Sequence, residues 1–200
     1  MRKCSKPEKY IYLLMNKPCA YVCAAASDSH KTVYELLTPE LQAMVTGAPR
    51  GSRLHTIGRL DCDTSGFLLI TNDGKFSNKI ATSPEIQKTY RATLAKPLAS
   101  EEQKKYIARA AGGLTLPSEK KFGEQEALPA ALIFESPEIC KITVQEGKFH
   151  EVRRIFRALG NEVIELQRVA IGNLELPPDL KPGQWRELSE VELRSLSLLK

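Results

Sequence analysis

Residues 55–74 read HTIGRLDCDTSGFLLITNDG, and this stretch decides how the chain folds. Its apolar run at 67–70 has turn-forming residues on both sides, which is the pattern of a buried strand. Asp61 and Asp63 lie in the turn-forming run before that strand. The sequence therefore places two carboxylates on a loop held by the core, and such loops often carry chemistry. The pair Asp73-Gly74 after the strand suits a tight turn.

Four roles are open for the two aspartates. Both can accept hydrogen bonds from nearby backbone N–H groups, and the T-S-G that follows Asp63 favours this role for it. The letters DCDTSG also open like a calcium loop, but the twelfth position is Asn72 where a bidentate Glu is needed. A glycosidase-like pair would require a set separation of the carboxylates. In the fourth role Asp61 alone is a nucleophile or base, positioned by Arg59.

Composition and charge describe a small folded protein with a mild excess of cations. The 200 residues suffice for one domain, or for one domain with two lobes, and for a sizeable core. Lys and Arg exceed Asp and Glu by 29 − 24 = 5. An excess of this size is weak evidence for a polyanionic partner, because solubility alone explains it.

The cysteines and the apolar runs indicate a reducing compartment. Five cysteines are scattered without a C-x-x-C pair or a matched pair of histidines, which argues against a disulfide framework and a zinc site. No apolar run approaches the roughly 20 residues that cross a bilayer. The polar start MRKCSKPEK lacks the apolar stretch of a signal peptide. We therefore expect a cytoplasmic protein with neither a metal nor a membrane partner.

The remaining patterns predict an α+β chain with a flexible tail at 1–9. Strands are expected at 10–15, 20–26, 67–70, 88–94, 130–134, 139–145, 162–167 and 172–176. Helices are expected at 32–37, within 39–53, at 75–81, at 100–111 with Ser100 as N-cap and Gln103 as its capping-box partner, at 148–159, and from Ser189. From residue 88 the order is β-α-β-β-α-β, the ferredoxin-like split arrangement. The expected lobes are 10–87 and 88–176, with a C-terminal segment at 177–200.

The helix expected at 148–159 has one basic and one apolar face. The basic positions follow the spacing i, i+3, i+4 and i+7, and they are His150, Arg153, Arg154 and Arg157. Three arginines on a stripe without an acid repel one another by a few tenths of a kcal/mol per pair. The pattern therefore indicates a polyanion or a buried acid opposite them, and a simply solvated face is the alternative.

The stretch around Asp61 resembles the central motif of the rRNA pseudouridine synthases, in particular the small-subunit (RsuA-like) family. That motif reads G-R-L-D-x-D-T-x-G-x-L-L-x-T-N-D-G. The matching positions are Gly58, Arg59, Leu60, Asp61, Asp63, Thr64, Gly66 and residues 71–74. A motif of this length is far more specific than an isolated glycine pattern.

Further motifs of the family follow in the same order. Its opening x-L-N-K-P-x-G-Y-V corresponds to residues 14–22, with Ala20 in place of the usual glycine. K-x-Y corresponds to 88–90, and E-G-x-x-H-x-V-R-R-M-F corresponds to 146–156. V-V-E-L-x-R-x-x-I-G corresponds to 163–172, with Gln167 where a histidine is usual and a less basic stretch after it. The resemblance covers about residues 10–195.

The resemblance implies a pseudouridine synthase fold, with a mixed, mostly antiparallel central sheet, flanking helices and a catalytic cleft across the sheet. It implies that Asp61 is the catalytic residue, that Arg153 pairs with it, and that Tyr90 packs against the target base. RNA or substrate contacts are expected from Arg59, Lys88, Leu166, His150, Arg154, Arg157 and Lys17.

The implied reaction explains why these residue types are needed. It breaks the N1–C1′ bond of uridine and joins C5 to C1′ without gaining atoms or changing oxidation state, so no cofactor or metal is required. The carboxylate of Asp61 can attack the ring or the sugar or remove a proton, and Arg153 would keep it ionised. Extruding the base costs a few kcal/mol, and stacking on Tyr90 contributes about 1–3 kcal/mol. Arg59 would fill the gap in the RNA, and Leu166 would keep water away.

The resemblance also suggests the target. The opening motif and the 162–172 stretch look more like the small-subunit enzymes, so we expect 16S rRNA, free or in a pre-ribosomal particle, with 23S rRNA as the alternative. A non-catalytic RNA-binding or assembly module is the rival from another class, and a glycoside hydrolase is a distant third. Family members usually carry an S4-like domain in front. About nine residues precede Tyr10, too few for that domain, so we expect a catalytic domain at 10–200 without it. We also expect the protein to be a monomer.

Overall fold

The structure, a computed structural model, describes residues 9–120 and 122–198 and divides the chain into two compact units. The first unit comprises Met1–Ser83 together with Asn173–Lys200, and the second comprises Pro84–Gly172. The C-terminal segment is thus part of the first unit. Of the tail predicted at 1–9, residues 1–8 lie outside the described residues. None of the described helices has the length and apolar character needed to cross a membrane.

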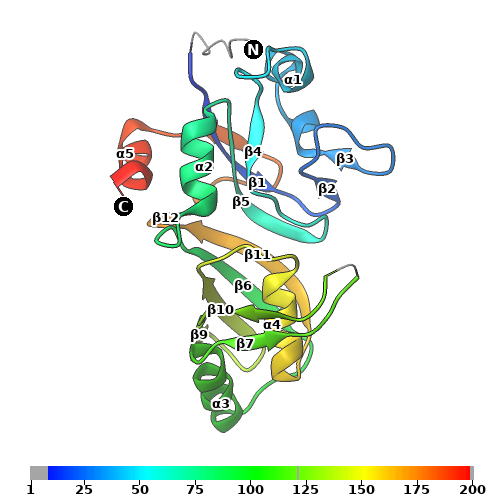
Figure 1. The fold of residues 1–200 in the computed structure, drawn as a ribbon, viewed down its shortest axis with the longest axis vertical. Coiled ribbons are helices and arrows are strands. Elements are labelled where there is room, and N and C mark those ends of the chain that lie inside the picture. Colours follow the sequence, from blue (N-terminus) through cyan, green and yellow to red (C-terminus); the bar gives the residue numbers. More distant parts are fainter. Residues whose placement is uncertain (1–8, 121, 199–200) are drawn as a thin grey trace. The chain divides into compact units, whose positions relative to one another are not determined.

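An antiparallel sheet forms the centre of the first unit (Figure 1). Its strands are β13 (Trp185–Glu187), β1 (Tyr12–Lys17), β5 (Thr64–Thr71) and β4 (His55–Ile57). β1 lies between β13 and β5, and β4 pairs with the C-terminal end of β5. The strand predicted at 67–70 is confirmed as the middle of β5, and its side chains are buried without alternation. This burial explains its continuous apolar run, because neither face of the strand meets water.

Short elements complete the first unit. They are β2 (Tyr21–Val22), β3 (Lys31–Thr32), the 3-10 helix η1 (Val33–Leu36), α1 (Pro39–Thr46), α2 (Gly74–Thr82), β12 (Leu174–Glu175) and α5 (Glu190–Leu198). The strand predicted at 20–26 is thus reduced to two residues, and the helix predicted at 32–37 is a single 3-10 turn.

The tight turn predicted at Asp73-Gly74 is wrong, because α2 begins there. The Asp73 carboxylate accepts hydrogen bonds from the backbone N–H groups of Lys75, at 3.0 Å, and Phe76, at 3.2 Å. These are two of the N–H groups that a helix start leaves without a backbone partner, so Asp73 is the N-cap of α2. The pair Asp-Gly occurs both in tight turns and at helix N-caps, and the helical pattern of the residues that follow decides between the two.

A bidentate ion pair joins α5 to β13. Arg186 donates from Nη2 to Oε1 of Glu192 at 2.6 Å and from Nη1 to Oε2 at 2.9 Å. The backbone N–H of Ser189 donates to the same carboxylate at 2.8 Å, which caps the helix near its predicted start. The hydrogen bond from Arg186 lowers the pKa of Glu192 to about 2, although burial acts in the opposite direction.

Replacing Glu192 by Gln is expected to remove an acid-sensitive part of the stability. Because the pKa of Glu192 is depressed in the folded state, its contribution is fully present above the unfolded value of about 4.3 and is lost as the pH falls toward about 2. Urea unfolding should therefore show wild type more stable than E192Q at neutral pH, and the difference should close in strong acid. Glu190→Gln is the control, since its pair with Arg194 is exposed. A difference that stays constant with pH would contradict the assignment.

The second unit has the predicted β-α-β-β-α-β order. Its antiparallel sheet runs β11 (Val163–Ile171), β6 (Lys88–Leu94), β10 (Ile139–Val144), β9 (Ala131–Phe134). The helices are α3 (Ser100–Ala111) and α4 (Glu151–Leu159). The N-cap of α3 is Ala99 and not Ser100, since Glu102 accepts a hydrogen bond from the Ala99 N–H at 3.0 Å.

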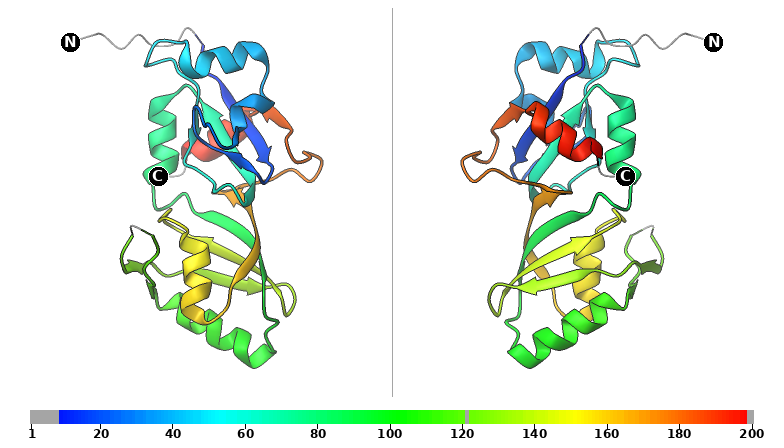
Figure 2. Two further views of the ribbon diagram at one scale, coloured as in Figure 1. Left: turned by 90° about the vertical axis from the view of Figure 1, so that its right-hand side faces the viewer. Right: turned by 90° about the vertical axis from the view of Figure 1, so that its left-hand side faces the viewer.

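The core of the second unit lies between α4 and one face of the sheet (Figure 2). Ile155 and Phe156 of α4 pack with Ala92 of β6, Ile142 of β10 and Leu166 of β11. A hairpin that the sequence did not predict, β7 (Leu114–Leu116) and β8 (Gln125–Ala127), is inserted between α3 and β9. The ferredoxin-like arrangement is therefore confirmed, with one added arm.

Candidate active site

The Asp61 loop, residues 58–63, joins β4 to β5 in the first unit. Gly58 enters it with φ +66°, a conformation that glycine adopts at little cost. The loop closes as a turn, because the Thr64 N–H donates to the Asp61 carbonyl oxygen at 3.1 Å. Asp61 is partly exposed, and Arg59 and Asp63 are exposed. The loop therefore holds the Asp61 carboxylate at a fixed point beside a buried strand, as the sequence predicted.

Lys17, at the end of β1, holds this loop through hydrogen bonds from its side chain. Its side chain is completely buried. The Nζ ammonium donates to three backbone carbonyl oxygens, those of Asp61 at 3.0 Å, Thr64 at 2.8 Å and Pro18 at 3.0 Å. The prediction that Lys17 contacts RNA or substrate is therefore wrong, because its charge is used inside the protein.

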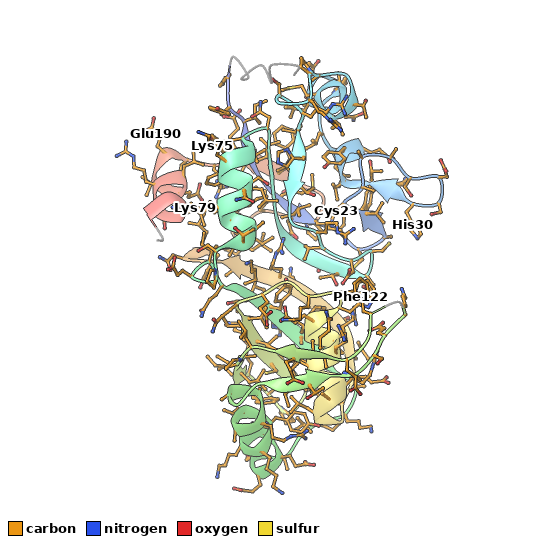
Figure 3. The ribbon with its side chains drawn as sticks, in the orientation of Figure 1. Cys23, His30, Lys75, Lys79, Phe122 and Glu190 are labelled. Carbon is orange, nitrogen blue, oxygen red and sulfur yellow. The ribbon has the colours of Figure 1, made fainter. Side chains whose placement is uncertain are left out.

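The surroundings of Lys17 are rich in thiols. Burial lowers the pKa of Lys17, and the nearby Cys23, Cys19, Cys62 and the carboxyl of Asp61 oppose that effect. Cys23, labelled in Figure 3, accepts from the Leu60 N–H at 3.5 Å. Among the described residues no group of three or more His, Cys, Asp or Glu side chains could hold a metal ion.

Ala20 stands where the family motif has a glycine, and it adopts a backbone conformation that favours glycine. It has φ +69°, in the left-handed region where the family has a glycine. Its N–H donates to the Cys62 carbonyl oxygen at 2.8 Å, so this strained turn is hydrogen-bonded to the Asp61 loop. A non-glycine residue in this region costs about 1 kcal/mol or more.

The second unit supplies the other implied residues, and three of them lie on the core face of its sheet. Lys88, Tyr90 and Ala92 are two positions apart along β6, so all three side chains project to the same face of the sheet, the one covered by α4. Leu166 of β11 lies opposite Ala92 and is buried, as its predicted role as a pocket wall requires. Arg168, which the site prediction missed, lies opposite Tyr90, with its guanidinium carbon 6.0 Å from the ring centroid.

Arg153 and Arg154 differ sharply although they are neighbours on α4. Arg153 is partly buried, and its Nη1 donates to the Val163 carbonyl oxygen at 2.7 Å. Arg154 is completely buried. Its guanidinium donates to the carbonyl oxygens of Pro117 and Gly123, to the Gln125 side chain and, at 3.3 Å, to the Phe149 carbonyl oxygen. The prediction that Arg154 contacts RNA is therefore wrong, since it holds the β7–β8 hairpin against α4.

An acidic residue lies opposite the basic positions predicted at 150–157, which was one of the two partners that the sequence indicated for them. Glu119, in the loop of the β7–β8 hairpin, bonds His150 Nδ1 at 2.9 Å and accepts from Arg157 Nη1 at 3.3 Å. Burial alone would raise the pKa of Glu119, but His150 and then Arg157 lower it below its usual value. His150 has φ +48°, and α4 begins only at Glu151, three residues later than predicted. Glu119 is thus an intramolecular partner of both His150 and Arg157, and an RNA contact of either side chain stays a prediction.

The comparisons with known proteins identify the family of the chain. The sequence model of the RNA pseudouridylate synthase family matches residues 11–158. The chain belongs to this family. The ribosomal small subunit pseudouridine synthase A of Escherichia coli K12 is 38% identical over 187 residues, which are 92% of this chain and 73% of that protein. The protein of the same description from Pasteurella multocida is 37% identical, over 93% of this chain and 73% of its own length.

A solved structure described as a pseudouridylate synthase superposes with a TM-score of 0.80 at 35% identity, covering 95% of this chain and 75% of that one. The fold predicted for this pseudouridylate synthase is thereby confirmed. The family match at 11–158 includes Asp61, Lys88, Tyr90 and Arg153. Arg168 lies beyond its end. A sequence signal for Arg168 existed in the L-x-R of residues 166–168, but nothing in that pattern says whether the arginine is buried.

Proposed function

We propose that this protein converts uridine into pseudouridine in the RNA of the small ribosomal subunit. The observation that carries the proposal is the 38% identity to a small-subunit pseudouridine synthase over 92% of the chain. The structure supports it with a carboxylate on a rigid loop and, in the second unit, an aromatic ring beside buried cations. These are the chemical groups that nucleophilic or base catalysis on an extruded nucleobase needs.

In this proposal Asp61 is the residue that acts on the target nucleotide. Arg153 pairs with it and fixes its orientation, an assignment that rests on the match to the family motif. Tyr90 stacks on the base, which is worth about 1–3 kcal/mol. Arg59 is exposed on the Asp61 loop, where it can reach RNA. Its role is to fill the space that the extruded base leaves. We further propose a cytoplasmic monomer.

The test is to incubate the purified protein with small-subunit rRNA, with large-subunit rRNA and with small-subunit particles, and to map pseudouridine in each. We expect one modified uridine in the small-subunit samples. Modification of large-subunit rRNA instead would favour the alternative target. RNA binding without pseudouridine in any sample would favour a non-catalytic RNA-binding module and would overturn the proposal.

A further inference from the structure

Three polar side chains interrupt the apolar face of the second unit's sheet. Along that face β6 presents Ala92 and Leu94 to the core, but its next positions toward the start of the strand are Tyr90 and Lys88. On β11 the same face passes from Leu166 to Arg168. A β-bulge follows Arg168, between it and Ala170, and such irregularities often re-aim side chains next to active sites. Burying two cations side by side is costly, so this end of the face calls for a functional explanation.

Lys88 is the less expected of the two cations. It is only 8% exposed. Within the described parts of the chain, no hydrogen bond or salt bridge involves its ammonium group. Burial lowers the pKa of Lys88, the charge of Arg168 lowers it further, and the buried Glu151 at the start of α4 acts against both. An amine in such a site gives up its proton more readily than an exposed lysine, which is how proteins prepare lysine as a base.

The reaction needs a base of this kind. Uridine carries a hydrogen on C5 and none on N1, whereas pseudouridine carries a hydrogen on N1 and none on C5. After the N1–C1′ bond has broken and the C5–C1′ bond has formed, C5 still holds its hydrogen. Breaking that C–H bond returns its electron pair to the ring, and N1 then takes up a proton. The step is redox-neutral and needs no further reactant, only a group that moves one proton from C5 to N1.

We propose that Lys88 is the group that removes the proton from C5 of the target base and delivers it to N1. This inference rests on the proposed function, and it replaces the simple RNA contact that the sequence predicted for Lys88. Tyr90 is two residues further along the same strand and face, so a base stacked on its ring is within reach of the Lys88 amine. Arg168, opposite Tyr90, orients that ring and disfavours the charged form of Lys88.

Lys88→Arg separates proton transfer from charge. Arginine keeps the positive charge and the hydrogen-bond donors but does not deprotonate in proteins. With an rRNA fragment containing the unmodified target uridine, we expect the single-turnover rate of K88R to fall by about 10²–10⁴-fold, the scale of a lost acid–base group. The dissociation constant for RNA should stay unchanged. Deuterium at C5 should slow K88R more than wild type, because proton removal has become the slow step.

Lys141→Arg is the matched control, since Lys141 lies on β10 next to β6, is exposed and is paired with Glu135, the residue after β9. It should behave as wild type. The isotope effect is a ratio of two rates of the same preparation, so it does not depend on how much of the variant is folded. Even a partly unfolded K88R therefore shows whether proton removal limits the rate. A wild type that makes no pseudouridine would overturn the proposed function itself. If wild type is active and K88R is equally active, the role of Lys88 alone is overturned. The same holds if K88R is slow but shows no isotope effect.

Discussion

Asp61→Asn is expected to lower the single-turnover rate of pseudouridine formation by about 10⁴-fold, the upper end of what one positioned catalytic group contributes. Asparagine matches aspartate in size but can neither attack as an anion nor accept a proton. The turn itself uses the Asp61 carbonyl oxygen, which bonds Lys17 and the Thr64 N–H and is unaffected by the substitution. RNA binding should therefore survive. The measurement is the rate at saturating RNA together with the dissociation constant.

Asp63→Asn is the matched control, because it makes the same substitution two residues away in the same loop. Asp63 is exposed, and the sequence predicts that it shapes the turn. It should change the rate little. Equal losses in both variants would mean that loop shape, and not the Asp61 carboxylate, limits the reaction. Normal turnover by D61N would end the proposal that Asp61 is the catalytic residue.

The predicted pairing of Asp61 with Arg153 can be tested in the same assay. Arg153→Ala alone should strongly reduce turnover, since the carboxylate would lose the guanidinium proposed to hold it in position. If the two residues act as a unit, R153A should cost little more when Asp61 is already Asn. Fully additive losses would show that Arg153 acts independently of Asp61.

The sequence predicted those elements whose pattern is set locally. The run at 67–70 has no polar position over four residues, so only a buried element can hold it, and it became the middle of β5. The alternation at 88–94 fixed both the strand β6 and the face on which Lys88 and Tyr90 lie. The Asp61 loop was found because turn residues and carboxylates coincide immediately before a buried strand.

The two wrong RNA-contact predictions, those for Lys17 and Arg154, share one physical cause, which is that backbone carbonyl oxygens of other segments accept hydrogen bonds from both cations. Lys17 and Arg154 have the sequence environment of surface residues, and charged side chains are rarely fully buried. Lys17 is buried because the loop after β4 brings two carbonyl oxygens to its ammonium. Arg154 is buried because the unpredicted hairpin around Glu119 closes over α4. No local pattern encodes the meeting of such segments.

Lys17→Met is expected to damage both stability and catalysis, and it has the largest expected effect on folding. Methionine fills a similar volume without donors, so the carbonyl oxygens of Pro18, Asp61 and Thr64 would be left without their partner. A buried acceptor left unsatisfied costs about 1–3 kcal/mol. Removing the desolvation cost of the ammonium offsets part of this sum, and we expect a net loss of about 3 kcal/mol. Urea unfolding at neutral pH measures it.

The catalytic effect should appear in turnover and not in RNA affinity. At a temperature where the variant is still folded, loss of the Lys17 hydrogen bonds would let the Asp61 loop sample other conformations, and a misplacement of about 1 Å can cost about 10²-fold in rate. The dissociation constant for RNA should match that of wild type. Lys75→Met, at an exposed lysine in the first turn of α2, is the control and should alter neither quantity.

The same experiment decides between the two roles considered for Lys17. A residue that contacts RNA would, when replaced, weaken binding and leave the rate at saturating RNA intact. A residue that holds the Asp61 loop would do the reverse, and would lower the free energy of unfolding as well. Because Lys17 is completely buried and its Nζ already serves three carbonyl oxygens, only the second pattern is compatible with the structure. A K17M variant that is stable and fully active at saturating RNA would show that the Asp61 loop holds its shape without this cation.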